Sequence, residues 1–184
     1  MKSYRAYAKV NIFLKITGKR GDYHEILSRF VLVNNLYDTL TFVPKEDGDF
    51  VIEGDFNCQT AQNTIYKAYK ALMEATQSQS LKRLMQSHAV RVEKKIPSFA
   101  GLGGGSSDAA TYLLMCNEVL HLGLSRDELA AIGAKVGADV LDIEAVCLQH
   151  RSDDGFADVV DVTLDCADDH PAQGFPSGSC QTYL

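Results

Sequence analysis

The stretch 97-PSFAGLGGGSSDAA-110 places four glycines within five positions and runs directly into a helix-forming, apolar segment at 109–122. Glycine has no Cβ, so such a loop can turn its backbone N–H groups toward a ligand that approaches closely. The helix start adds unpaired N–H donors and a partial positive charge, and a serine or aspartate beside it can cap the first turn. The stretch predicts a cradle for an anion, most simply the phosphates of a nucleotide. A flexible loop that merely precedes a helix is the alternative.

The segments around this loop predict a mixed α/β domain. Alternating large side chains predict strands at 4–16 and 89–96, one or two more within 26–44, and a short one at 50–54. A turn is expected at 17–22, where two glycines fall close together. Helical spacing predicts helices at 63–77 and 125–139, the second opened by a capping box of Ser125 and Glu128. These patterns alone indicate an α+β domain with the order strand, glycine loop, helix.

Composition excludes several classes of protein. A length of 184 residues, 46% hydrophobic and 23% charged, fits one soluble domain or slightly more. The net charge of -6 argues against a nucleic-acid binder. The chain has no apolar run of about 18 residues and no secretory signal, so we expect a cytoplasmic protein that does not enter membranes. The five cysteines form no CxxC pair, which argues against a zinc site or a disulfide framework.

The chain changes character near residue 140. Residues 1–140 contain 17 basic and 15 acidic residues, whereas residues 141–184 contain one basic and nine acidic residues. One strand fits 156–164, and 170–184 is typical of a loop or of disorder. The sequence therefore predicts a domain at 1–140 followed by an acidic, partly disordered tail at 141–184.

The glycine loop does not match two common phosphate-binding motifs. A Walker A loop requires a lysine after its last glycine, where this chain has Ser106. A dinucleotide fingerprint requires a third glycine at that position and an acidic residue about 20 positions later. This chain has Ser106 in place of that glycine and lacks the acidic residue at a strand end, which argues against an oxidoreductase that binds NAD.

The loop does resemble the phosphate loop of the superfamily of galactokinase, homoserine kinase, mevalonate kinase and phosphomevalonate kinase. Its triple-glycine form, followed by SSDAA, is similar to one family within it, the 4-diphosphocytidyl-2-C-methyl-D-erythritol kinases. The segment 8-AKVNIFLKITGKRGDYHEILS-28 resembles that family's N-terminal signature, and 136-VGADV-140 matches the place of its aspartate. One departure is that the family has a glycine between Asp22 and Tyr23, which this chain lacks. The three matches span about three quarters of the chain.

The resemblance implies a fold and a reaction. The expected fold is a two-layer α+β sandwich of the type of ribosomal protein S5 domain 2. The reaction would transfer the γ-phosphoryl group of ATP, with Mg²⁺, to a hydroxyl of the cytidyl substrate in the non-mevalonate route to isoprenoids. Asp139 would accept the hydroxyl proton and Lys9 would steady the charge, while Asn11, Tyr23 and His24 would bind the substrate.

The resemblance also implies an ATP site on the glycine loop. Ser106 or Ser107 would offer a hydroxyl to phosphate or Mg²⁺, and Asp108 would cap the helix or brace the loop rather than catalyse. The residues expected to bind ATP are Asn63, Pro97, Ala100, Gly101, Leu102, Gly103, Gly104, Gly105, Ser106 and Ser107.

After residue 140 the resemblance stops. The family continues there into a second domain that forms part of the substrate wall, and residues 141–184 resemble none of it. We therefore expect 1–140 to be the N-terminal, ATP-binding kinase domain, with most of the C-terminal domain missing and the activity impaired. The alternative is a remnant that binds nucleotide without catalysis. The oligomeric state is left open.

Overall fold

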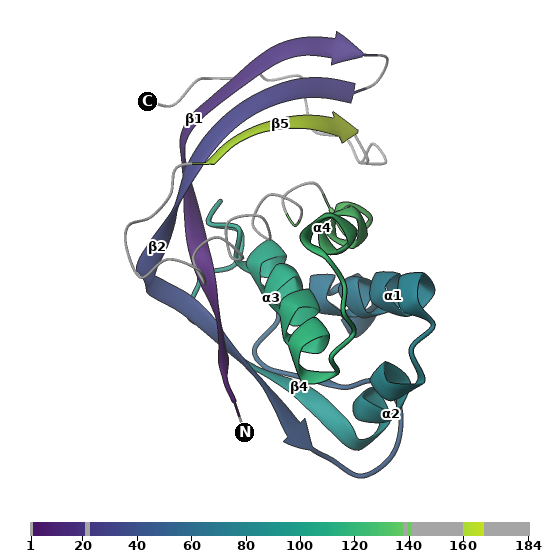
Figure 1. Ribbon diagram of the computed structural model, residues 1–184. Coiled ribbons are helices and arrows are strands. Elements are labelled where there is room, and N and C mark those ends of the chain that lie inside the picture. Colours follow the sequence, from purple (N-terminus) through teal and green to yellow (C-terminus); the bar gives the residue numbers. More distant parts are fainter. Residues whose placement is uncertain (1, 21–22, 138–139, 141–159, 168–184) are drawn as a thin grey trace.

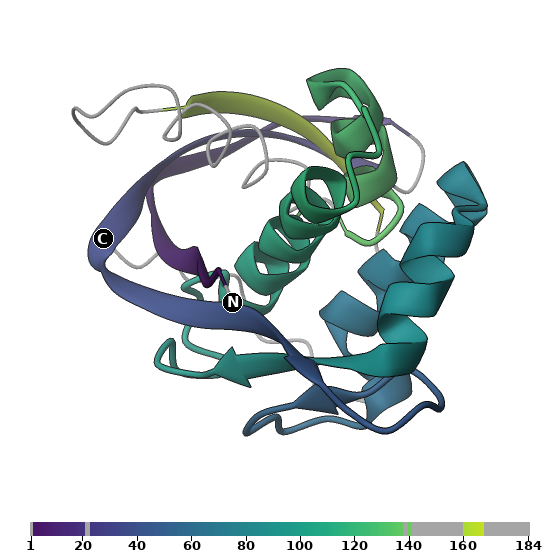
Figure 2. The same ribbon diagram turned by 60° about the horizontal axis from the view of Figure 1, so that its bottom comes forward.

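The protein is a two-layer sandwich in which helices cover one side of a curved sheet (Figures 1 and 2). The computed structural model describes residues 2–20, 23–137, 140 and 160–167. Within these residues the sheet has five strands. Helices α1, α3 and α4 lie together on its concave side, as Figure 2 shows. The predicted α/β class and two-layer arrangement are confirmed.

Two long antiparallel strands form the curved ribbon that dominates the sheet. Strand β1 covers Tyr4–Arg20 and β2 covers Tyr23–Pro44. The segment 26–44 is thus a single strand, and β1 continues into the stretch expected to be a turn, as far as Arg20. The register between β1 and β2 shifts in three places, one of them between Tyr7 and Ala8. Such bulges bend and twist a strand, and here they accompany the arch of the ribbon (Figure 1).

The other strands pair around β2. Strand β4 (His88–Glu93) is antiparallel to the second half of β2, and β3 (Ile52–Glu53) is parallel to β4. Strand β5 (Val160–Ala167) is antiparallel to the first half of β2. The strand expected at 156–164 is therefore present, but it begins and ends a few residues later. The sheet order is β1-β2-β4-β3, with β5 paired to β2.

Within the described residues, four α-helices and one short 3₁₀ helix accompany the sheet. The 3₁₀ helix η1 covers Thr60–Gln62, and the α-helices cover Thr64–Thr76 (α1), Gln79–Ser87 (α2), Gly104–Val119 (α3) and Arg126–Ala134 (α4). The capping box predicted for α4 is confirmed, because Ser125 and Glu128 bond each other's backbone N–H. Helix α2 was not predicted, although its buried residues Leu81 and Met85 are four positions apart, as on one helix face.

The hydrophobic core lies between the helices and the second half of the sheet. Helix α3 is its centre, because ten of its residues are buried, from Ser107 to Cys116. Helix α1 contributes Ile65 and Leu72, and the sheet contributes Leu40 and Val90, all fully buried. A helix that is apolar on nearly every side must be surrounded by other elements. This packing fixes the N-terminus of α3, where the glycine loop ends.

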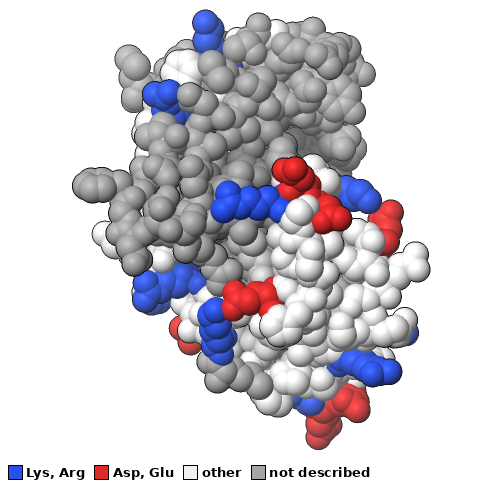
Figure 3. All heavy atoms as spheres, viewed as in Figure 1, with Lys and Arg blue, Asp and Glu red and all other residues white. Residues whose placement is uncertain are grey.

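None of the helices in the described part of the chain is long and apolar enough to cross a membrane. On the face of the molecule shown in Figure 3, the basic and acidic side chains of described residues alternate without forming a large patch of one sign.

Candidate functional site

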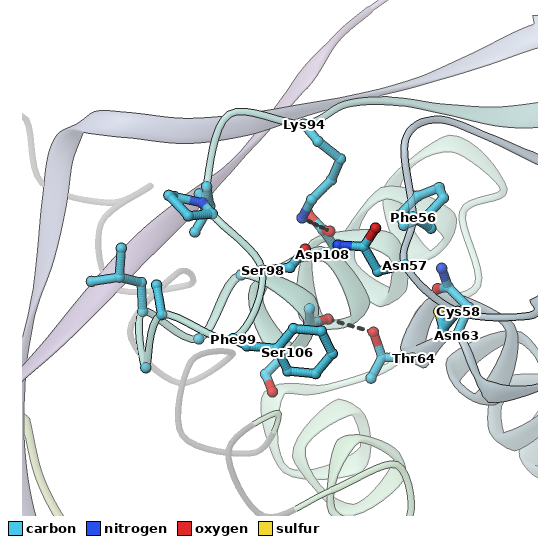
Figure 4. Close-up of a pocket in the computed structure, with 18 of the residues that line it drawn as sticks. Phe56, Asn57, Cys58, Asn63, Thr64, Lys94, Ser98, Phe99, Ser106 and Asp108 are labelled. Atoms are coloured by element: carbon cyan, nitrogen blue, oxygen red, sulfur yellow. Dashed lines mark hydrogen bonds and ion pairs between the residues drawn. The ribbon is translucent and has the colours of Figure 1, made fainter.

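A cavity of about 490 Å³ lies between the glycine loop, the start of α3 and the segment from Phe56 to Thr64. Its size is within the range of small-ligand sites. Figure 4 shows the loop curving along one side and Asn57, Cys58 and Asn63 on the other. All the residues predicted to bind ATP line this cavity, with the exception of Ser107. The structure therefore gathers residues that are about 40 positions apart, while their role in ATP binding stays a prediction.

Helix α3 begins within the glycines, earlier than expected. Its first residue is Gly104, and Gly103 stands before it with a φ of 67°, a left-handed conformation that glycine adopts without strain. The prediction that a serine or aspartate side chain caps this helix was wrong, because the N-cap residue is Gly103, which has no side chain. The first N–H groups of a helix have no helical partner. Here they belong to residues that line the cavity, which suits an anion.

Gly104 also allows a close approach of two elements. A Cβ at this position would lie 2.9 Å from Cγ2 of Ile96, a residue that is almost completely buried. Real Cβ atoms do not reach this distance, so the helix start can sit against Ile96 only because residue 104 is glycine. Ile96 and Gly104 both line the cavity, so their close contact forms part of its wall.

The two serines of the loop differ in placement. Ser106 is half-buried and lines the cavity. Ser107 is completely buried, and its Oγ has no hydrogen-bond partner among the described residues. Of these two serines, only Ser106 therefore lines the cavity, and the role of its hydroxyl toward phosphate or Mg²⁺ stays a prediction. The described residues contain no group of three or more His, Cys, Asp and Glu side chains able to hold a metal ion.

Asn63 and Thr64 join the opposite wall to the loop. The side chain of Asn63 accepts a hydrogen bond of 2.9 Å from the N–H of Ile65 and so caps α1. The Thr64 hydroxyl donates a bond of 2.6 Å to the carbonyl oxygen of Gly105, drawn as a dashed line in Figure 4. Asn63, predicted to lie near the nucleotide, is thus a buried residue of the cavity wall with a structural bond of its own.

Lys9 lies beside the glycine loop. Its backbone N–H donates to the carbonyl oxygen of Leu102 at 2.9 Å, which ties β1 to the loop. Its side chain is buried, and Nζ donates to Oδ1 of Asn11 at 2.9 Å. The ammonium also lies 5.9 Å from the centre of the Phe30 ring. The structure therefore places Lys9 and Asn11 together next to the loop, and their roles in catalysis and substrate binding stay predictions.

Tyr23 and His24 are not brought to the same place. His24 pairs with Lys19 of β1 and Tyr23 pairs with Arg20. Lys19 is ten positions beyond Lys9, which is roughly 30 Å of strand length. The backbone of both residues thus lies at the far end of the ribbon from the glycine loop (Figure 1). Asp139 is outside the described residues, so its expected pairing with Lys9 stays a prediction.

A buried ionic cluster lies beneath the loop. Nζ of Lys94 is 2.5 Å from Oδ2 of Asp38 and 2.7 Å from Oδ2 of Asp108, and both carboxylates are almost completely buried. Burial raises the pKa of Asp108 to about 7 against the opposing effect of Lys94, and the charge of Asp38 adds to the rise. Burial alone would lower the pKa of Lys94, but the two carboxylates outweigh it and the pKa is raised.

The sequence analysis missed several residues of the site. Asp38 and Lys94 were not singled out, although Asp38 is the only acidic residue within 26–44, the stretch expected to form strands. Phe99 was also missed. It is 94% exposed, borders the cavity and has a φ of 60°, a strained value for a residue with a side chain (Figure 4). Asp108 was expected to cap a helix or brace the loop, and its bond to Lys94 is a brace.

Comparison with known proteins gives the family. A protein of Sulfurimonas denitrificans named 4-diphosphocytidyl-2-C-methyl-D-erythritol kinase is 66% identical over 144 residues, which cover 76% of this chain and 54% of that protein. A protein of the same name from Campylobacter jejuni subsp. jejuni serotype O:6 is 39% identical over 184 residues, covering 97% of this chain and 69% of the relative. The chain belongs to the 4-diphosphocytidyl-2-C-methyl-D-erythritol kinase family.

The domain-level and structural matches agree with this family. The model described as the GHMP kinases N terminal domain matches residues 63–150. A crystal structure of 4-(cytidine 5'-diphospho)-2C-methyl-D-erythritol kinase is similar, with 32% identity and a TM-score of 0.56, over 77% of this chain and 48% of that one. Mevalonate pyrophosphate decarboxylase from Streptococcus pyogenes shares the fold at 15% identity, with a TM-score of 0.54 over 77% of this chain and 44% of that one. The fold is the one predicted, that of ribosomal protein S5 domain 2.

The match to the kinase family is partial in length. The chain spans about half the length of the first curated relatives, 54% in both cases. The family model ends at residue 150, and the Campylobacter alignment covers 97% of the chain, so both extend past residue 140. The division into 1–140 and a non-homologous tail stays a prediction.

Proposed function

We propose that the chain transfers the γ-phosphoryl group of ATP to a hydroxyl of 4-diphosphocytidyl-2-C-methyl-D-erythritol, a step of the non-mevalonate route to isoprenoids. The observation that carries this proposal is the cavity at the start of α3, where the glycine loop faces a wall formed by Asn63 and Thr64 and is bonded to the backbone of Lys9. Family membership supports the choice of substrate.

In the proposed reaction the substrate oxygen attacks the γ-phosphorus, the bond to the ADP oxygen breaks, and the hydroxyl proton passes to Asp139. The N–H groups at the start of α3 bind the phosphates, and the buried ammonium of Lys9 offsets the negative charge that develops during transfer. Phosphoryl transfer requires mainly positioning and charge stabilisation, and these groups supply both. Tyr23, His24 and Asn11 would bind the cytidyl substrate.

The site also fits Mg²⁺ as a companion of ATP. Mg²⁺ is usually held by one or two protein oxygens together with phosphate oxygens and water. Ser106 offers its hydroxyl at the helix start, inside the cavity, and would share in holding the ion. When bound, Mg²⁺ would supply positive charge against the phosphate oxygens.

A second candidate function is nucleotide binding without transfer. The observation that favours it is the distance along the ribbon between Lys9 and the pair Tyr23 and His24, because the expected substrate contacts are not gathered at the glycine loop. In this case ATP or ADP would bind in the cavity, but no hydroxyl would be held in line with the γ-phosphate.

A coupled assay of ADP release, with and without the cytidyl substrate, distinguishes the two. The proposed kinase releases ADP only when the substrate is present, and Asp139→Asn abolishes this release. Asp127→Asn is the matched control, since it removes an acid from the first turn of α4, away from the loop. ATP binding measured by calorimetry without any release that depends on the substrate would favour the second function and contradict the first.

A further inference from the structure

The glycine loop is fixed at its N-terminal end by one buried carboxylate. Oδ1 of Asp38 accepts hydrogen bonds from the backbone N–H of Lys95 at 2.5 Å and of Ile96 at 2.9 Å. These are the last residues before the loop begins at Pro97. Asp38 belongs to β2, in the middle of the sheet, and is completely buried. The loop therefore leaves the sheet from a point that cannot shift without breaking two bonds to a charged acceptor.

The same carboxylate is joined to the other end of the loop through a single ammonium. Nζ of Lys94 donates to Oδ2 of Asp38 at 2.5 Å and to Oδ2 of Asp108 at 2.7 Å. Asp108 is in the second turn of α3, just after the loop ends. Figure 4 shows the Lys94 side chain pointing toward Asp108. One side chain thus connects the strand that enters the loop with the helix that leaves it.

The loop between these two ends is open. Phe99 is 94% exposed, and a Cβ added to Gly101 would meet no atom of the described residues within 4 Å. Two further bonds hold the loop from neighbouring elements, those of the Lys9 N–H to Leu102 and of the Thr64 hydroxyl to Gly105. A loop with so little packing of its own depends on its ends for its shape.

The cluster of Asp38, Lys94 and Asp108 is expected to add little to the free energy of unfolding. Removing three charged groups from water costs about as much as their pairing returns, and well-packed apolar residues often serve as well. The cluster also has one carboxylate in excess over its ammonium. What it supplies is a fixed geometry, because hydrogen bonds between charged groups are short and directional.

We propose that Asp38, Lys94 and Asp108 are positioning residues that hold the phosphate loop in its binding shape before the nucleotide arrives. This inference rests on the proposed function only in taking ATP as the ligand. A loop that is already in the binding shape binds more tightly, because the apparent dissociation constant is the intrinsic one divided by the fraction of molecules in that shape. Loosening one end of the loop lowers that fraction.

The variant Asp108→Ala tests this inference in the full chain. It detaches α3 from Lys94 and leaves the pair of Lys94 and Asp38 balanced in charge, so no buried charge is left without a partner. Hydrogen exchange of the backbone amides at 98–105 is measured without nucleotide, together with the dissociation constant of ATP by calorimetry. Asp108→Asn keeps an acceptor for Lys94 and serves as the conservative variant. Arg91→Ala is the control, because it removes an exposed cation of β4 that pairs with Glu53.

We expect the loop amides of Asp108→Ala to exchange about tenfold faster than those of the wild type, and ATP to bind about tenfold more weakly. The amides at 109–116 should keep their wild-type exchange. Asp108→Asn should remain close to the wild type in both measurements, and Arg91→Ala should match it.

Unchanged exchange of the loop amides in Asp108→Ala would overturn the inference. If ATP binding fell at the same time, Asp108 would be a direct contact of the nucleotide instead. Equal acceleration at 109–116 would also overturn it, because the cluster would then act through general stability. None of these outcomes depends on phosphoryl transfer, so a wild-type chain that binds ATP without turnover would contradict the proposed kinase and leave this test intact.

Discussion

Replacing Asp108 by asparagine should flatten part of the pH dependence of folding stability. In the folded chain the pKa of this carboxyl is raised from 3.8 to about 7, mainly because it is buried. At a pH between these two values the folded state holds a proton that the unfolded state has released. A raised pKa therefore stabilises the fold at low pH, and this stabilisation is lost as the pH rises through about 7.

The size of the effect follows from the two pKa values. Each pKa unit corresponds to about 1.4 kcal/mol of stability. From about pH 5 to about pH 8 the pH passes through about two of the units that separate the folded and unfolded pKa values, and the stabilisation falls accordingly. The free energy of unfolding of the wild type should thus fall by about 3 kcal/mol relative to that of Asp108→Asn over this interval. Asparagine has nearly the same shape and still accepts a bond from Lys94, so packing changes little.

Urea denaturation at 25 °C, followed by circular dichroism at several pH values, measures this difference. Other acids contribute to both curves, so only the change in the difference between the two proteins is compared. Glu53→Gln is the control, because Glu53 forms an exposed pair with Arg91 at 2.8 Å, and exposed pairs contribute at most about 1 kcal/mol. Stability curves for the wild type and Asp108→Asn that run parallel from about pH 5 to about pH 8 would refute the reasoning.

Three further changes have distinct expected results. Gly104→Ala should lower the melting temperature by several degrees, because its Cβ would lie 2.9 Å from Ile96 and overpacking costs about 1–3 kcal/mol. Gly105→Ala, whose Cβ would have its closest contact at 3.4 Å, should leave the melting temperature unchanged or raise it. Ser125→Ala should cost about 1 kcal/mol in thermal unfolding, because it removes the cap of α4. Lys9→Met should reduce ADP release that depends on the substrate by at least about a hundredfold while the melting curve keeps its shape. Equal melting of the two glycine variants, or full turnover by Lys9→Met, would contradict these expectations.

The parts of the fold that depend on local pattern could be predicted from the sequence. The alternating residues of β1 and β4, the spacing of apolar residues in α1 and the capping box of α4 each act within a few positions of the chain. The start of α3 could not be predicted in this way. Glycine has a low helix propensity, so a run of glycines is expected to lie outside a helix. Here tertiary contacts around Gly104 and Gly105 extend the helix into the loop.

The ionic cluster shows what a linear pattern leaves out. Asp38 and Lys94 are 56 positions apart, and Asp108 follows Lys94 by 14. In the sequence Lys94 belongs to the charged run 93-EKK-95, which is typical of an exposed segment. Only the pairing of β2 with β4 brings Asp38 beneath the end of the strand, where Thr39 pairs with Glu93. The residues that brace the loop therefore follow from the sheet register, and the motif itself does not reveal them.

Lys9 illustrates how a bulge changes the meaning of a pattern. Strict alternation would place Lys9 and Ala8 on opposite faces of β1, yet both are buried, and Val10 is 39% exposed. The register shift between Tyr7 and Ala8 precedes this change. A buried ammonium requires a compensating negative charge, and among the described residues its partners are the neutral Asn11 amide and the Phe30 ring. This is the environment expected of a lysine whose anionic partner is Asp139 or a phosphate of the bound nucleotide. Alternation alone would assign Lys9 to the polar, exposed face of β1. After the bulge its ammonium is buried beside the glycine loop, where the proposed transfer needs a positive charge.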